Sequence, residues 1–183
     1  MIDNSLENLR AELEGLGRPV VDLWISGVDG GTVVEKLGGN VPADVVAWFR
    51  WCGGVRLMPG QIQDDANLIP GYEPLGLEEA VSSKEEFGAM DAILGDSWVP
   101  LLQGGADFYA AVYGHAKGNF IASVMPESGV VAVYEDVVQM VDAFTECYRR
   151  GAFFVDSDGM LDMDFDIWEA VDRDFPFRLR GDL

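Results

Sequence analysis

The sequence predicts an α+β fold in a single domain, residues 1–183, with a mostly antiparallel central sheet of about six strands flanked by helices. Three observations predict it. The length of 183 residues is that of one domain. Hydrophobic residues make up 49% of the chain, as in globular proteins. Four apolar segments follow one another at hairpin spacing, and segments with helical periodicity lie on both sides of them.

The amino-terminal part is expected to contain a helix, a strand and a hairpin. Asn4 or Ser5 can cap the helix, because both side chains accept hydrogen bonds from backbone N–H groups. Residues Val20–Ile25 have the composition of a strand. The glycine-rich stretch Gly27–Gly39 predicts a turn or hairpin. The apolar stripe of the helix consists of Leu6, Leu9, Leu13 and Leu16.

The next segment predicts a short amphipathic helix that leads into a strand. Pro42 suits the first helical position, where no N–H group is needed. Gly53 and Gly54 end the helix, because glycine adopts left-handed conformations without a steric penalty. Residues Val55–Met58 then have a strand-like composition. The residues that recur at helical spacing are Val45, Trp48, Phe49 and Cys52.

The central region is expected to form the sheet. Residues Tyr72–Leu75 can pair with a neighbouring strand, and a helix is expected from about Leu77 to Leu94, weakened by Gly88. Turn-rich connections then separate successive apolar segments, which indicates antiparallel hairpins. The four expected strands are Trp98–Leu102, Phe108–Tyr113, Phe120–Val124 and Val130–Tyr134.

The carboxy-terminal part predicts a helix, a short strand, a turn and a last helix. The first helix runs from about Asp136 to Arg150, with Gly151 to stop it. Phe153–Val155 is the strand, and Asp156–Gly159 is the turn. The last helix is expected from Asp164 to Arg173. The sequence does not fix the residue at which this helix starts, because residues 161–167 also alternate apolar and acidic side chains with the period of a strand.

Charge is the strongest compositional indication of function. Lys and Arg total 12 against 32 Asp and Glu, a net charge of −20. Such a surface repels phosphate backbones and anionic lipid, so neither nucleic-acid nor membrane binding is expected. It attracts basic proteins, although acidity can also serve solubility alone. No apolar run is long enough to span a bilayer, and Cys52 and Cys147 suit buried thiols in a reducing compartment, so a cytoplasmic location is expected.

No catalytic or cofactor motif accompanies the one histidine. His115 lies in the turn-like segment Gly114–Gly118, without the HxxxH, CxxC or GxSxG patterns of metal or nucleophile sites. Lys117 lacks the glycine-rich run of a phosphate-binding loop. The sequence therefore predicts no catalytic residue, no metal ligand and no cofactor.

A cluster of carboxylates near the carboxyl end has three interpretations. It can be a solvated face, a surface for a basic partner, or the metal site of a divalent-metal hydrolase. A calcium loop fits poorly: read from Asp156 its glycine falls at the wrong position, and read from Asp158 Met163 stands where glycine must turn the chain. The cluster comprises Asp156, Asp158, Asp162, Asp164, Asp166, Glu169, Asp172 and Asp174.

Aromatic residues divide into expected core residues and expected surface anchors. Trp51 lies off the main stripe of its helix, and Tyr72 lies in the loop Pro70-Gly71-Tyr72, so both are candidate exposed anchors for a partner. The tryptophans on apolar periodic positions, which are expected in the core, are Trp24, Trp48, Trp98 and Trp168.

Several of these segments together resemble the SUKH superfamily, which includes fungal cell-wall-synthesis regulators of the Smi and Knr type and many bacterial immunity proteins. The resemblance extends over about Val41 to Val155, with residues 1–40 and 156–183 as peripheral elements. Trp51-Cys52-Gly53-Gly54 stands where the family usually has an acidic residue, Asn and two glycines. The similar segments, in family order, are Pro42 with Trp48–Val55, Leu75–Ala80, Trp98–Leu102 with Gly104–Phe108, Gly129–Val131 and Val141–Phe144.

The resemblance implies an α+β fold and a role in binding rather than in catalysis. In bacteria such proteins bind and block polymorphic toxins, so we expect a basic toxin domain as the partner and the chain to be a monomer or weak dimer. A free-standing regulatory scaffold is the alternative within the binding class, and the metal-dependent hydrolase is the alternative outside it. The residues expected to contact the partner are Trp51, Asp64, Asp65, Tyr72, Asp162, Asp164, Asp166 and Glu169.

Overall fold

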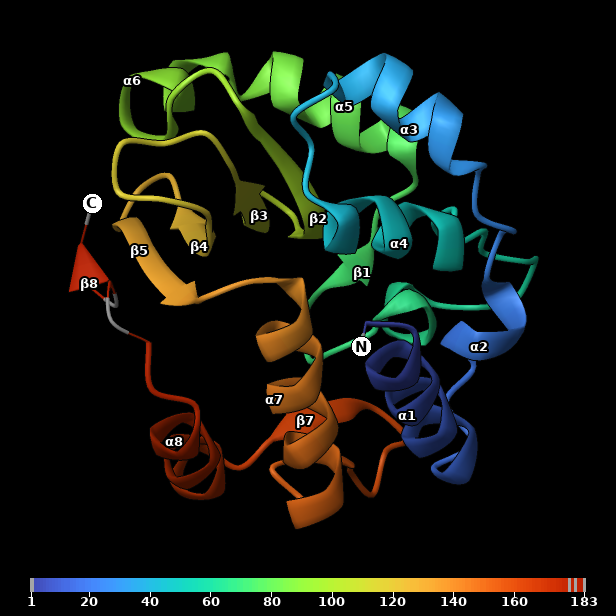
Figure 1. Cartoon of the computed structure of the whole chain (residues 1–183). Coiled ribbons are helices and arrows are strands. Elements are labelled where there is room, and N and C mark those ends of the chain that lie inside the picture. Colours follow the sequence, from blue (N-terminus) through green and yellow to red (C-terminus); the bar gives the residue numbers. More distant parts are fainter. Residues whose placement is uncertain (1, 178, 180, 183) are drawn as a thin grey trace.

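The computed structural model describes residues 2–177, 179 and 181–182, and it confirms the α+β class. Within these residues the strands form a six-stranded sheet of order β1-β2-β3-β4-β5-β8, in which every pair of neighbours is antiparallel (Figure 1). The strands of the sheet are β1 Glu73–Pro74, β2 Trp98–Gly104, β3 Asp107–Val112, β4 Phe120–Met125, β5 Gly129–Tyr134 and β8 Gly181–Asp182. The strands β6 Phe153–Val155 and β7 Leu161–Met163 pair separately.

Helices and short 3₁₀ turns surround this sheet. The expected helix 77–94 is interrupted after α5, at the position where Gly88 weakens it. The helix expected to follow Asp136 is capped by that residue, whose side chain accepts the N–H of Gln139 at 2.8 Å. The helices are α1 Ile2–Gly15, α2 Val20–Leu23, α3 Gly30–Leu37, α4 Ala43–Trp51, α5 Leu77–Glu86, α6 Asp91–Leu94, α7 Val137–Arg150 and α8 Phe165–Asp174, with 3₁₀ turns η1 Gln63–Ala66 and η2 Gly88–Met90.

Several sequence predictions between residues 2 and 58 are wrong. α1 begins at Ile2, before either expected cap, and Leu16 lies beyond its end, 43% exposed. The expected strand at 20–25 is helix α2, because Pro19 has a fixed helical φ of −60° and starts a turn. Within this segment Trp24 forms one isolated antiparallel bridge, to Val55. The strand expected at 55–58 does not form apart from this same bridge.

The glycine-rich stretch forms helix α3 instead of a hairpin. The carboxylate of Asp29 accepts the N–H groups of Gly31 at 2.9 Å and Thr32 at 3.2 Å. Two of the free donors at the start of the helix are thereby satisfied, and Val33 is buried against the core. Local capping therefore outweighs the low helix propensity of the two glycines that follow.

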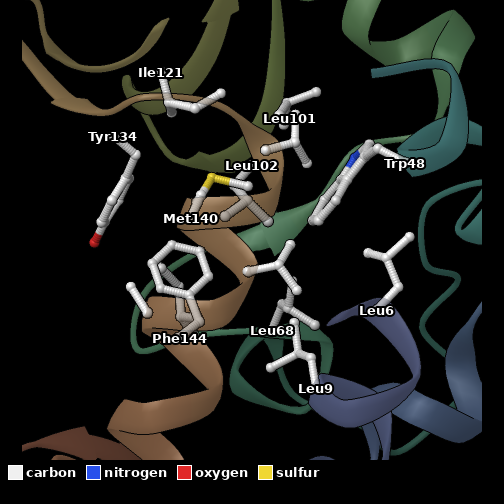
Figure 2. Close-up of a cluster of buried hydrophobic side chains, with 14 of the residues drawn as sticks. Leu6, Leu9, Trp48, Leu68, Leu101, Leu102, Ile121, Tyr134, Met140 and Phe144 are labelled. Carbon is white, nitrogen blue, oxygen red and sulfur yellow. The ribbon is translucent and has the colours of Figure 1, made fainter. Parts of the chain in front are cut away.

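The two faces of the sheet pack against different layers. The main core lies between one face and the helices α1, α4 and α7, and Figure 2 shows Leu6, Leu9 and Trp48 converging with Met140 and Phe144 below Leu101. The smaller core on the other face contains alternate strand residues such as Trp98 and Phe108, covered by Phe87, Met90 and Leu94 after α5 and by Phe177 and Leu179. Alternation along the strands sorts the side chains between the two faces.

A crossing of three backbone segments explains why glycines occupy the end of α4. Residues 25–28, the Gly53-Gly54 turn and Gly76 lie in direct contact, joined by hydrogen bonds such as Gly53 N to Ile25 O at 2.9 Å. A Cβ on Gly53 would lie 2.3 Å from the carbonyl oxygen of Ser26. Gly54 has a φ of +91°, a conformation that favours glycine. Only glycine permits this approach.

Candidate functional site

A groove of about 620 Å³ opens between the main-core face of the sheet and helix α8, within the size range of ligand sites. We call it the aromatic groove. Its floor consists of partly buried side chains on three strands, Tyr109, Ser123, Met125, Val131 and Val133. Its sides and mouth include Tyr72, Phe144, Phe165, Trp168 and Asp172. Among the described lining residues none is basic.

The groove exists because helix α7 covers only part of this face of the sheet. Ala111 and Ile121 on the same face are buried in the main core, whereas the neighbouring positions toward β5 stay partly open. Helix α8 lies beside α7 (Figure 1) and packs Val171 against the core. An apolar strip across β3, β4 and β5 therefore faces α8 without being covered by it.

Helix α8 is held in place by contacts at both ends. The Asp164 side chain caps it by accepting the N–H of Ile167 at 3.0 Å, and the Asp164 backbone N–H donates to Ala152 O at 2.8 Å. At the other end Arg150 of α7 contacts Asp174 at 2.6 Å. The helix thus presents Trp168 and Asp172 to the groove and Phe165 at its mouth, where the phenyl ring is 67% exposed.

A chain of ring contacts continues from the groove into the core. Tyr72 meets Tyr109 edge-on with ring centroids 5.1 Å apart, and Tyr109 meets Phe144 at 5.8 Å. Burial, and then the charge of Asp107, raises the pKa of Tyr72. Burial also raises the pKa of Tyr109, with a smaller contribution from Asp172. Both phenols therefore stay protonated and neutral, in surroundings that already disfavour negative charge.

Asp172 is the one carboxylate in the described lining of the groove, and further carboxylates lie on the elements that form it or pack against it. Within the described part of the chain, the side chains of Asp166 and Glu169 on α8 make no hydrogen bond or ion pair, and neither does that of Asp107 beside Tyr72. Asp162 on β7 is exposed and accepts only the N–H of the next residue, at 2.8 Å. Apart from this local hydrogen bond of Asp162, the side chains of these acids have no partner among the described residues, and they are free to meet a ligand.

Two of the predicted contact residues have structural roles instead. Asp64 is buried and pairs with the buried Arg18 at 3.1 Å, and it also accepts the N–H of Leu161 at 3.0 Å. Asp65 accepts the N–H of Ile62 at 3.1 Å and so stabilises turn η1. The sequence could not reveal the Asp64 pairing, because its partners lie 46 and 97 residues away.

Trp51 is not the exposed anchor that its helical position predicts. Its ring lies 4.5 Å from that of Trp24 and 5.5 Å from that of Trp48, and its indole N–H is buried without a hydrogen-bond partner among the described residues. The segment after α2 packs over this side of α4, which a helical pattern alone cannot show. Trp24 and Trp168 are half-buried, and Trp48 and Trp98 are fully buried.

Of the remaining predicted contact residues, Tyr72 lines the groove. Asp162, Asp166 and Glu169 do not line it, but they lie on β7 and α8, the elements that contribute Met163, Phe165 and Trp168 to its lining. Asp164, between these two elements, caps α8 with its side chain. The sequence reasoning missed Phe165 and the floor of the groove. An exposed aromatic residue at the first position of an otherwise amphipathic acidic helix was the available signal for Phe165.

The carboxylates do not converge on a point. Among the described residues, no group of three or more His, Cys, Asp and Glu side chains is arranged to hold a metal ion. His115 lies in the turn after β3, where its Nδ1 accepts the N–H of Lys117 at 3.1 Å and its ring meets Phe120 edge-on.

No protein-family model matches the chain, and no curated protein is significantly similar to it. The family resemblance therefore stays a prediction. In the described part of the chain, no helix combines the length and apolar character required to cross a bilayer.

Proposed function

We propose that this chain is a protein-binding domain of SUKH type, and that it acts as an immunity protein that blocks a basic toxin domain by covering it. The observation that carries the proposal is the aromatic groove together with the exposed ring of Phe165 and the unpaired carboxylates of Asp166 and Glu169 on the adjoining helix α8. A large aromatic anchor beside exposed charges is the composition of binding hot spots.

The net charge of −20 supports a basic partner. Opposite charges accelerate the encounter of two proteins, and apolar anchors slow their separation. An acidic face of this kind can cover the basic surface with which a toxin would bind its own anionic substrate. Inhibition by covering requires no reacting group on this chain.

Co-expression tests the proposal. Toxin domains encoded beside this gene are expressed in a bacterial host with and without the chain, and growth and 1:1 complex formation are measured. We expect protection of growth and a complex that weakens when ionic strength rises from about 0.1 M to about 1 M, where the Debye length falls from about 10 Å to about 3 Å. Failure of every neighbouring domain to bind would refute the immunity proposal.

Matched variants locate the charge effect. D166N/E169Q removes two unpaired acids beside the groove, and E85Q/E86Q removes two exposed acids from the distant helix α5. We expect the first pair to slow association more than the second, because charges near the contact steer the encounter most strongly. Titration of the chain with Ca²⁺, Mg²⁺ and Mn²⁺ tests the alternative that the chain is a metal-dependent hydrolase. Micromolar binding of one of these ions would count against inhibition by covering alone.

A further inference from the structure

We infer that helix α8 and the aromatic groove together recognise a segment of the partner that carries a basic side chain, arginine or lysine, next to apolar residues. The basic side chain lies over Phe165 with its charge at Glu169, and the apolar residues enter the groove beside Trp168. This inference rests on the proposed function and specifies the chemistry of the partner at that site.

The spacing of residues on α8 is the first observation. Phe165 and Glu169 are four residues apart, so the aromatic ring has a carboxylate one helical turn away on the same face. Lys and Arg have an apolar stem and a charged head, and they pack the stem on a ring while the head contacts an acid. This pair fits one basic side chain.

The charge of the surroundings is the second observation. The described lining of the groove contains Asp172 and no basic residue, and Asp107 and Asp166 add charge at its border. An anionic ligand such as a fatty acid would be repelled, and so would a second copy of a chain with a net charge of −20.

The exposure of Phe165 is the third observation, and it favours a protein segment over a small cation. A small amine inside the groove would leave this ring, 67% exposed, in contact with water. A peptide segment that crosses the mouth covers the ring and fills the groove at the same time. Ser123, Met125 and Val131 on the floor then contact the apolar residues of the segment.

An unbiased peptide selection on the full-length chain tests the inference. The probe is an mRNA-displayed library of random 12-residue peptides, and enriched peptides are synthesised and measured by fluorescence anisotropy. We expect enrichment of sequences with a Lys or Arg residue next to aromatic or large aliphatic residues. Enrichment of acidic or purely apolar peptides, or no enrichment at all, would overturn the inference.

Variants of the chain locate the binding site of the enriched peptides. We expect F165S and the groove-filling S123F each to weaken binding about tenfold, and E169Q to weaken it about threefold, as for exposed charge pairs. The matched controls are M58S, which removes a 57% exposed apolar side chain elsewhere, and E85Q on α5; both should stay within about twofold of the unchanged chain. If F165S and S123F bind the enriched peptides as tightly as the unchanged chain does, the inference is overturned.

Each variant is first checked for an unchanged urea midpoint, so that loss of binding cannot be due to unfolding. The same variants separate this inference from the proposed function. A neighbouring toxin domain that binds F165S and S123F as tightly as the unchanged chain would sustain the proposed function and overturn the role of the groove. If basic peptides bind in the groove but no toxin domain binds the chain, the binding site is supported and the proposed immunity function is refuted.

Discussion

Neutralising Asp64 should destabilise the chain strongly, because this carboxylate serves the fold and not a partner. It contacts Arg18 Nη2 at 3.1 Å, Asn67 Nδ2 at 3.2 Å and the N–H of Leu161 at 3.0 Å. The guanidinium side chain is 2% exposed, and its Nε already lacks a partner among the described residues. In D64N the buried cation loses its compensating negative charge and is left with neutral acceptors, the side-chain amide and the backbone oxygen of residue 64 at 2.6 Å.

Removing one member of a buried ion pair costs about 3–5 kcal/mol, because the other charge stays buried without compensation. For a chain of 183 residues each kcal/mol lowers the melting temperature by about 2–4 °C, so D64N should melt roughly 6–20 °C earlier. Urea unfolding followed by circular dichroism gives the free energy, and an unchanged slope confirms that only stability has changed.

Two further variants identify the cause of the loss. D65N removes a carboxylate next in sequence that only stabilises turn η1, and it should cost about 1 kcal/mol. R18M/D64L removes both buried charges and should be more stable than D64N, because hydrophobic replacements of buried pairs are often neutral within about 2 kcal/mol. A loss below about 1 kcal/mol in D64N, or equal instability of the double variant, would refute the reasoning.

Three other predictions concern the core. G53A should lower the free energy of unfolding by about 2–3 kcal/mol, since its Cβ would overlap the Ser26 carbonyl, whereas G39A, with open space around it, should change it by less than about 0.5 kcal/mol in the same urea assay. Burial raises the pKa of the Cys52 and Cys147 thiols from 9.0 to about 12, so thiol reagents should label the folded chain at least about a thousandfold more slowly than the unfolded chain at pH 8. Because folding holds these protons more tightly, stability should be complete below pH 9.0 and decline progressively from there toward about pH 12; a flat urea midpoint between pH 8 and 10.5 would contradict this. W51F should stay within about 1 kcal/mol of the unchanged chain and W51A should lose about 3–5 kcal/mol in calorimetry, because the ring packs on Trp24 while its N–H has no partner.

Elements with local signals could be predicted from the sequence. Strands β2 to β5 follow from hairpin spacing, and α7 and α8 follow from a capping aspartate and an amphipathic stripe. Helices α2 and α3 could not be predicted from composition, because their valines favour strands while Pro19 and Asp29 start helices. The decisive signals there were single residues at helix starts.

The groove could not be predicted, because it depends on how much of the sheet α7 covers. Register irregularities also make the groove hard to predict. The shift between Pro100 and Leu102 places Leu101 and Leu102 together in the main core. The shift between Ile121 and Ala122 places Tyr134 in the same core. No periodicity in the sequence encodes which of these positions a helix then covers.

Several acidic residues stabilise the fold, so fewer carboxylates remain that a partner can contact. Asp29, Asp136 and Asp164 cap helices, and Asp64 compensates a buried arginine, so their carboxylates are already engaged by the fold. A partner gains little from acids whose lone pairs are committed to backbone donors, since it would have to displace those hydrogen bonds.

Glu169 differs from these acids in having no partner among the described residues, and it lies one helical turn from the most exposed large apolar side chain of that part of the chain, Phe165. Neither feature helps folding, because an unpaired charge and a ring in water contribute nothing to the core. Both lie on one helix, beside an uncovered strip of the sheet. Selection for folding alone does not explain this arrangement, whereas binding of a basic, partly apolar partner segment explains it.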